Sequence, residues 1–172
     1  MKVVAFFLAL GLIATPALAF ETEEIGLLKA TFGEESISQP TVIAKADGAS
    51  SPTAYFTVIG GFSFLSFSGF MSDNSRLDIS ATFQAETPSP QKPPFQLDIQ
   101  YKAPGEKGYW TSDGAPIAAS IAFTVLEHDD NEGHAVGSFS GALCYAESYG
   151  ADADPENCRP IEGNFDTKFF IE

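Results

Sequence analysis

Two histidines and several carboxylates surround one short acidic segment. His128 and His134 lie on either side of residues 129–133, which read Asp-Asp-Asn-Glu-Gly. If this segment is a tight turn between two strands, the imidazoles would face each other across the hairpin with Asp130 beside them. Two imidazoles and a carboxylate can hold Zn²⁺. Polar residues also collect at hairpin ends without a metal, so a pH-sensitive histidine pair and an ordinary turn remain alternatives.

A second acidic segment resembles a calcium loop only in part. Asp152 and Asp154 alternate with alanines, as carboxylates alternate at the start of an EF-hand loop. Further along, Asn157 stands where that loop requires Gly, and Gly163 stands where it requires a bidentate Glu. The segment is therefore predicted to be a solvated hairpin tip, with Ca²⁺ binding as the alternative.

The two cysteines, Cys144 and Cys158, predict one disulfide, because thiols are oxidised in an exported chain. In an extended strand Cys144 points to the face opposite to Phe139 and Leu143, and Cys158 points to the face opposite to Ile161. Both cysteines are therefore expected on the wetter face of two neighbouring strands. Closing this loop should stabilise the fold by about 3 kcal/mol, and a bridged pair leaves no thiol nucleophile.

Tyr109 and Trp110 form an aromatic pair in a loop bounded by Pro104 and Pro116. Such a pair can stack against sugars or peptide side chains, which makes it a candidate ligand platform. The alternative is that Trp110, the single tryptophan of the chain, plugs an open end of the core.

No complete catalytic motif is present. The stretch Gly137–Gly141 has Phe139 where a serine hydrolase needs its nucleophile, and no glycine-rich phosphate loop precedes a helix. We therefore expect a non-catalytic module without a cofactor, which binds a protein, a glycan or a small ligand or acts as an envelope interaction protein. The alternative is a hydrolase that depends on carboxylates or on a metal, because Asp and Glu are abundant.

Strict alternation of apolar and polar residues indicates half-buried strands. No segment keeps helical spacing of apolar residues behind a cap, so no helix is predicted in the mature domain. The pattern predicts an all-β fold, an antiparallel β-sandwich or flattened barrel of about eight strands. The predicted strands are Leu27–Phe32, Thr53–Ile59, Phe62–Ser68, Leu77–Gln84, Phe95–Lys102, Ile117–Leu126, Gly133–Tyr145 and Cys158–Ile171.

Two connecting segments are informative. Residues 48–72 carry no charge, yet Gly60 and Gly61 at their centre favour a tight hairpin between buried strands over the alternative, a membrane span. Proline stiffens the segment Glu86–Pro94, which we expect to cross between the two sheets of the sandwich.

The N-terminus has the features of a cleaved signal helix. Lys2 precedes the uncharged run Val3–Ile13, and Ala17-Leu18-Ala19 is a small-x-small cleavage site. Residues 1–19 are therefore predicted to be removed, which leaves residues 20–172 as one periplasmic or secreted domain. A retained anchor helix is the alternative, although the run is shorter than the roughly 20 apolar residues that a span needs.

Charge limits the partners of the mature chain. Without Lys2 it carries 8 Lys and Arg against 23 Asp and Glu, a net charge of −15. Nucleic acids and anionic membrane surfaces both require clustered basic residues, so neither is expected as a partner. Cations and basic protein surfaces suit this charge.

Two short patterns in the last third of the chain are related. Gly137–Gly141 reads Gly-x-Phe-x-Gly, and Ile161–Phe165 reads Ile-x-Gly-x-Phe. In these residues the chain resembles the C-terminal hairpin of many small exported bacterial proteins of unknown function. The resemblance implies a β-sheet domain exported by a Gram-negative bacterium and no particular activity.

Overall fold

The computed structural model describes residues 21–46 and 48–172, where the regular secondary structure is all β-strand. The predicted signal peptide, residues 1–19, lies outside the described residues. Every predicted strand is present, and three further strands, β2, β3 and β8, were not predicted. The strands are β1 (Glu21–Phe32), β2 (Glu35–Ala46), β3 (Ala49–Pro52), β4 (Ala54–Ile59), β5 (Phe62–Ser68), β6 (Arg76–Phe83), β7 (Gln96–Lys102), β8 (Tyr109–Thr111), β9 (Ser120–His128), β10 (Glu132–Ala146) and β11 (Asp154–Ile171).

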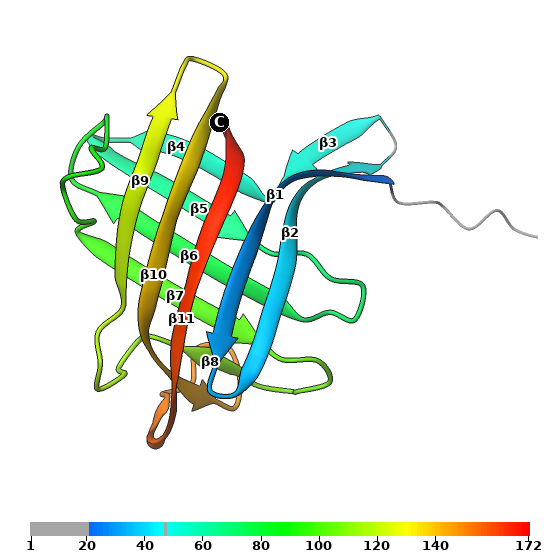
Figure 1. Ribbon diagram of the computed structural model, residues 1–172, viewed down its shortest axis with the longest axis vertical. Coiled ribbons are helices and arrows are strands. Elements are labelled where there is room, and N and C mark those ends of the chain that lie inside the picture. Colours follow the sequence, from blue (N-terminus) through cyan, green and yellow to red (C-terminus); the bar gives the residue numbers. More distant parts are fainter. Residues whose placement is uncertain (1–20, 47) are drawn as a thin grey trace, which may run out of the picture.

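The eleven strands form one continuous sheet that folds into two crossing layers (Figure 1). The front layer has the order β3-β2-β1-β11-β10-β9, and the back layer has the order β4-β5-β6-β7-β8. At one corner the end of β11 pairs with β4 in parallel, and at another the end of β10 pairs with β8. The expectation of about eight antiparallel strands is thus corrected to eleven strands in a mixed sheet, because β2, β3 and β8 add to the predicted strands and the corner between β11 and β4 is parallel.

The hydrophobic core lies between the two layers. Alternate residues of the long strands point inward, and aromatic rings fill most of the space, with Phe67 and Phe123 both contacting Phe165 at ring distances of 5.2 and 5.5 Å. The largest fully buried side chains are Tyr101, Phe32, Phe56, Phe67, Phe165, Phe169, Leu28, Leu65, Leu77, Ile79, Ile99 and Leu143.

The glycine and phenylalanine pattern noted in the sequence has a structural cause at the centre of the front layer. In the β10–β11 register Gly137 lies opposite Phe165, and Phe139 lies opposite Gly163. Each ring covers the glycine of the facing strand, so a Cβ on Gly137 would overlap the Phe165 ring and one on Gly163 would overlap the Phe139 ring. Glycine is required here because the ring occupies the space of a side chain, a pairing that also permits strong curvature of the sheet.

Strand β2 was not predicted because two of its buried positions, Gln39 and Thr41, are polar and Pro40 lies between them. Buried Gln39 donates from Nε2 to Ser75 Oγ at 3.1 Å and accepts the Leu77 N–H at 2.7 Å. The hydroxyls of Thr41 and Thr167, both buried, hydrogen bond at 2.6 Å. These bonds fix β2 to the back layer and to β11 without an apolar alternation.

The predictions for the two connecting segments have different outcomes. Gly60 and Gly61 form the turn of the β4–β5 hairpin with φ of 62° and 85°, which confirms the predicted hairpin. The segment Glu86–Pro94 joins β6 to β7, which pair with each other in the back layer, so the predicted crossover is wrong. Among residues 21–46 and 48–172, no helix has the length and apolar character needed to span a membrane.

Candidate functional site

A groove of about 970 Å³ lies where the chain passes from the back layer to the front layer, between β7 and β9. We call it the β7–β9 groove. Its floor is the first half of β7 with the end of β8, and its walls are the connections that follow β8 and β10. The lining residues are Pro93–Asp98, Gln100, Tyr109, Thr111–Ala115, Ala118–Ile121 and Tyr149–Ala153.

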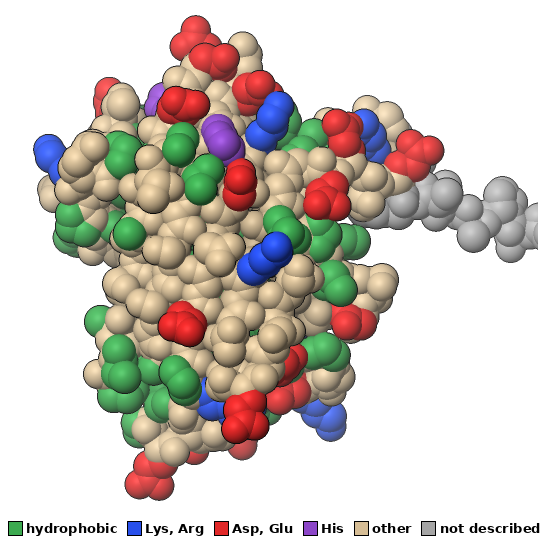
Figure 2. All heavy atoms as spheres, viewed as in Figure 1, with side chains coloured by type: hydrophobic (Ala, Val, Ile, Leu, Met, Phe, Trp, Pro, Cys, Tyr) green, Lys and Arg blue, Asp and Glu red, His purple; other side chains and the backbone are tan. Residues whose placement is uncertain are grey.

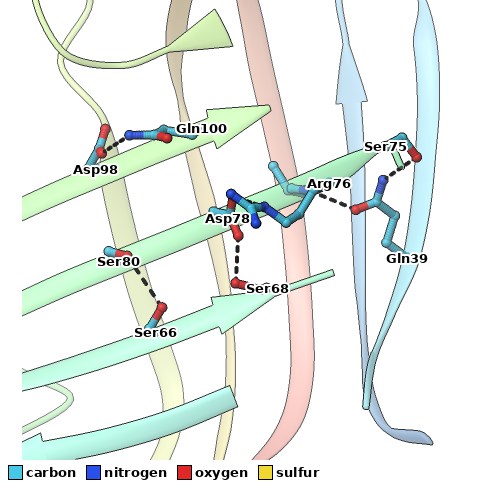
Figure 3. A network of polar contacts seen from close by, with 10 residues as sticks. Gln39, Ser66, Ser68, Ser75, Arg76, Asp78, Ser80, Asp98 and Gln100 are labelled. Atoms are coloured by element: carbon cyan, nitrogen blue, oxygen red, sulfur yellow. Dashed lines mark hydrogen bonds and ion pairs between the residues drawn. The ribbon is translucent and has the colours of Figure 1, made fainter. Parts of the chain in front are cut away.

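Asp98 is a polar group of the groove that several hydrogen bonds hold in place. It lies on the outward face of β7, where Gln100 Nε2 donates to its Oδ2 at 2.7 Å (Figure 3). Ser112 Oγ donates to Oδ1 at 3.1 Å. Thr111 Oγ1 donates to the same Oδ1 at 3.4 Å. These three partners hold the carboxylate in one orientation, so its remaining lone pairs are available for a ligand at a defined position.

Figure 3 also shows how this carboxylate belongs to a polar outer face on the back layer. Ser68 Oγ donates to Asp78 Oδ1 at 2.6 Å, and Ser66 and Ser80 contact each other at 3.4 Å on the neighbouring strands. These short side chains bond among themselves. Asp98 differs because it lines the groove and bonds to Ser112 of the connection after β8.

The floor of the groove is an incompletely paired strand edge. On the side away from β6, β7 pairs with β8 only at Gln100 and Tyr101. Ser112 extends this contact by one residue, since its N–H donates to the Ile99 carbonyl and its Oγ accepts the Ile99 N–H, both at 2.9 Å. No described strand pairs with Leu97 on this side. Alternate residues of an antiparallel strand point the same way, so the Leu97 N–H and C=O point into the groove.

Aromatic side chains stand on the walls. Tyr149 is 90% exposed and lies 6.3 Å from Tyr109 between ring centres, with a 33° angle between their planes. Phe95, 71% exposed, also lines the groove. The two adjacent tyrosines offer a surface for stacking.

Trp110 does not share this surface, so the predicted platform of Tyr109 with Trp110 is corrected. Its ring is 2% exposed and makes edge contacts with Phe32 at 5.0 Å and Tyr145 at 5.4 Å. Its Nε1 donates to Glu106 at 2.9 Å, and Arg159 covers the ring at 4.5 Å. Adjacent residues of a strand point to opposite faces, so one ring lines the groove while the other closes the core.

The charges of the groove have one sign. Asp98, Asp113 and Asp152 line it, and no Lys, Arg or His does. Asp113 and Asp152 are exposed, and within the described residues neither carboxylate has a hydrogen-bond or ion-pair partner. The groove therefore presents uncompensated negative charge next to aromatic rings.

The predicted histidine pair does not form. In the β9–β10 hairpin His128 lies opposite Gly133, and His134 lies opposite Glu127, so the two imidazoles lie on opposite faces of the sheet. His128 packs on Phe56 at 5.1 Å, whereas His134 Nε2 lies 2.8 Å from Asp166 Oδ1. The expectation of facing imidazoles is wrong because the register offsets them by one residue.

The other predicted metal residues are also apart. Asp130 is exposed in the β9–β10 turn. Asp154 begins β11 and accepts the Glu156 N–H at 3.0 Å, while Asp152 lines the groove. Within residues 21–46 and 48–172, no three His, Cys, Asp or Glu side chains gather as a metal site would require.

The predicted disulfide between Cys144 and Cys158 is confirmed, with the two residues directly opposite in the β10–β11 register. The expected exposure is wrong for Cys144, which is fully buried, while Cys158 is half-buried. Cys144 is enclosed because β10 pairs here with β11 on one side and with Thr111 of β8 on the other. A disulfide is consistent with an oxidising compartment.

The front layer presents a different surface. Figure 2 shows that its centre consists mainly of uncharged polar side chains and backbone, with most acidic residues around its margins. A shallow depression of about 730 Å³ crosses it, lined by Ser36, Ser38, Ser138 and Ser140 among others. It has no exposed aromatic ring, so it lacks the stacking surface of the β7–β9 groove.

Sequence reasoning missed Asp98, Ser112 and Tyr149, because the groove combines three segments that are distant in the chain. The high exposure of Tyr149 has no sequence signature beyond its place in a Gly- and Asp-containing loop. The chain matches no protein-family model, no curated protein and no solved structure. The resemblance of its C-terminal hairpin to exported bacterial proteins therefore stays a prediction.

Proposed function

We propose that this protein is an exported, non-catalytic binding module and that the β7–β9 groove is its ligand site. The observation that carries the proposal is the lining of the groove: adjacent tyrosines, an open strand edge and three carboxylates in one concave surface. A volume of about 970 Å³ is at the upper end of ligand pockets, so it suits a ligand of several sugar or amino-acid units.

Charge narrows the class of ligand. Three carboxylates without a basic neighbour repel anions, and the net charge of the chain, −14, adds to that repulsion at longer range. An uncharged or cationic ligand meets no such barrier. We therefore assign the groove to neutral glycans, amines or basic peptides, and not to acidic glycans or nucleotides.

The arrangement of the carboxylates supports binding over hydrolysis. Asp98 accepts hydrogen bonds from Gln100, Ser112 and Thr111. In the described part of the chain Asp113 and Asp152 make no contact with it, so no pair of carboxylates is brought together for hydrolysis. The disulfide supports export to the periplasm or the outside of the cell. The module would act there as a receptor for its ligand or as a connector in the envelope.

A ligand screen followed by ¹⁵N NMR tests this function. Panels of neutral oligosaccharides, polyamines, basic peptides and acidic oligosaccharides are each titrated into the labelled protein. We expect at least one of the first three panels to shift amides of residues 96–98, 111–120 and 149–153, and acidic oligosaccharides to shift none of them.

Matched variants make the screen specific. Tyr149→Ala should weaken binding about tenfold, the loss expected for a stacked ring of about 1–1.5 kcal/mol. Ile59→Ala, which removes a side chain 64% exposed outside the groove, should leave binding unchanged. The proposal fails if no panel perturbs the groove, or if the two variants weaken binding equally.

A further inference from the structure

We infer that the β7–β9 groove binds an extended peptide segment of a partner protein that carries lysine or arginine at alternate positions and adds as a strand to the open edge of β7. This inference rests on the proposed function and names the ligand class of the same site. Three independent features of the groove support it: its backbone, its charge and its rings.

The backbone groups that face the groove favour an added strand. Leu97 directs its N–H and C=O into the groove, whereas Ile99, two residues further along, has both groups bonded by Ser112. An extended peptide beside Leu97 would continue the line of bonds that Ser112 begins. Strand addition of this kind takes affinity from main-chain bonds and specificity from alternate side chains.

The carboxylates and aromatic rings of the groove favour cationic side chains on that strand. Side chains of an added strand point alternately to the two faces of the sheet, so every second one lies over the outward face that carries Asp98. Asp113 and Asp152 stand on the walls with no partner among the described residues. Tyr109 and Tyr149 offer ring faces against which a guanidinium or ammonium group binds by cation–π attraction.

The same features favour a basic peptide over the other occupants. A neutral glycan would leave three carboxylates uncompensated, and a small amine would leave the Leu97 backbone groups unpaired. A second copy of the chain would bring another net charge of −14 to an already acidic surface. Only a basic peptide meets both requirements at once.

Defined peptides test the inference on the full chain with its disulfide intact. The probe is acetyl-(Ala-Lys)₄-amide, compared with acetyl-(Ala-Glu)₄-amide and with maltohexaose. We expect the lysine peptide to shift the amides of residues 96–98, 111–120 and 149–153 and the other two probes not to. The same lysine peptide with alternate N-methylated residues should bind about tenfold more weakly, because the methyl group removes a strand hydrogen bond.

Variants separate the groove from general attraction to an acidic protein. Asp113→Asn and Asp152→Asn should each weaken binding about threefold, as exposed ion pairs do, and the double variant about tenfold. Asp130→Asn removes an equal charge at the exposed β9–β10 turn and should have no effect. Thermal melting of all variants confirms that each is folded.

The outcomes distinguish this inference from the proposed function. If maltohexaose or a polyamine shifts the groove and the lysine peptide does not, the groove is a ligand site and the peptide inference is overturned. Equal binding of the N-methylated peptide, or equal losses in the Asp130 and groove variants, also overturns it. If no ligand of any class shifts the groove, both the inference and the proposed function fail.

Discussion

The centre of the front layer pairs its strand edges and buries its aromatic rings, whereas the corner between β7 and β9 leaves a strand edge unpaired and its rings exposed. Strands β10 and β11 pair from Glu132 to Tyr145, and the rings of Phe139 and Phe165 are covered on both sides. At the corner, β7 meets β8 at two residues, and the rings of Phe95 and Tyr149 face solvent. Proteins usually protect open strand edges and large apolar patches, so the corner where both stay open is where we place the proposed ligand site.

The largest contrast should appear in the cost of removing a ring. Phe165→Ala deletes a side chain that is 1% exposed and contacts both Phe67 and Phe123, so it should lower the free energy of unfolding by about 3–5 kcal/mol. Phe95→Ala in the corner should change it by about 0.5 kcal/mol or less. Urea denaturation measures both, and similar losses would contradict the distinction.

The next largest effect on stability is expected from removal of the disulfide. Cys144→Ala with Cys158→Ala should lower the free energy of unfolding by about 3 kcal/mol, because the bond closes a loop with a sequence separation of 14. A reducing agent should bring the natural chain to the stability of this double variant and should not affect the variant itself. A natural chain unaffected by verified reduction would show that the bond restricts the unfolded state little.

Gly163→Ala probes the fit between ring and glycine. A methyl group at this position would overlap the Phe139 ring and the Lys29 carbonyl oxygen, so overpacking should cost about 1–3 kcal/mol. The double variant Gly163→Ala with Phe139→Leu frees the space of the ring and should lose less than the two single losses added together. Strict additivity in chemical denaturation would contradict the direct contact.

The smallest expected effect concerns alkaline pH. Burial raises the pKa of Tyr101 well above its usual value, with the hydrogen bond from its hydroxyl to Glu35 as a further cause. The folded chain therefore retains this proton while the unfolded chain loses it above about pH 10, so the contribution of Tyr101 to stability is present below that pH and declines above it. Relative to Tyr101→Phe, the natural chain should lose up to about 1.4 kcal/mol per pH unit above pH 10. Parallel stability curves for the two proteins would refute this.

Much of the fold could be predicted from alternation. Strands such as β6 and β7 have apolar residues on one face only, so they were recognisable. Strand β2 was not, since Gln39 and Thr41 are buried through hydrogen bonds that depend on residues far away in the chain. Strand β8 has three residues, too few to show a period.

The candidate site was less accessible to sequence reasoning. Parity correctly brought Cys144 and Cys158 together, yet it could not show that β8 encloses Cys144 at a corner between layers. A one-residue offset in register separated His128 from His134. The groove depends on where β7 stops pairing, and that is decided by the course of the chain after Thr111 and not by the residues of β7.

Native-state hydrogen exchange at Leu97 and Ile99 tests the central claim most directly. These residues lie in one strand, and only the Ile99 amide has a partner, Ser112 Oγ, on the side of the groove. In the free protein the Leu97 amide should exchange at least about a hundredfold faster than that of Ile99, and saturating acetyl-(Ala-Lys)₄-amide should slow Leu97 selectively. Equal protection of the two amides in the free protein, or no change at Leu97 in the saturated complex, would contradict an open edge that binds a peptide strand.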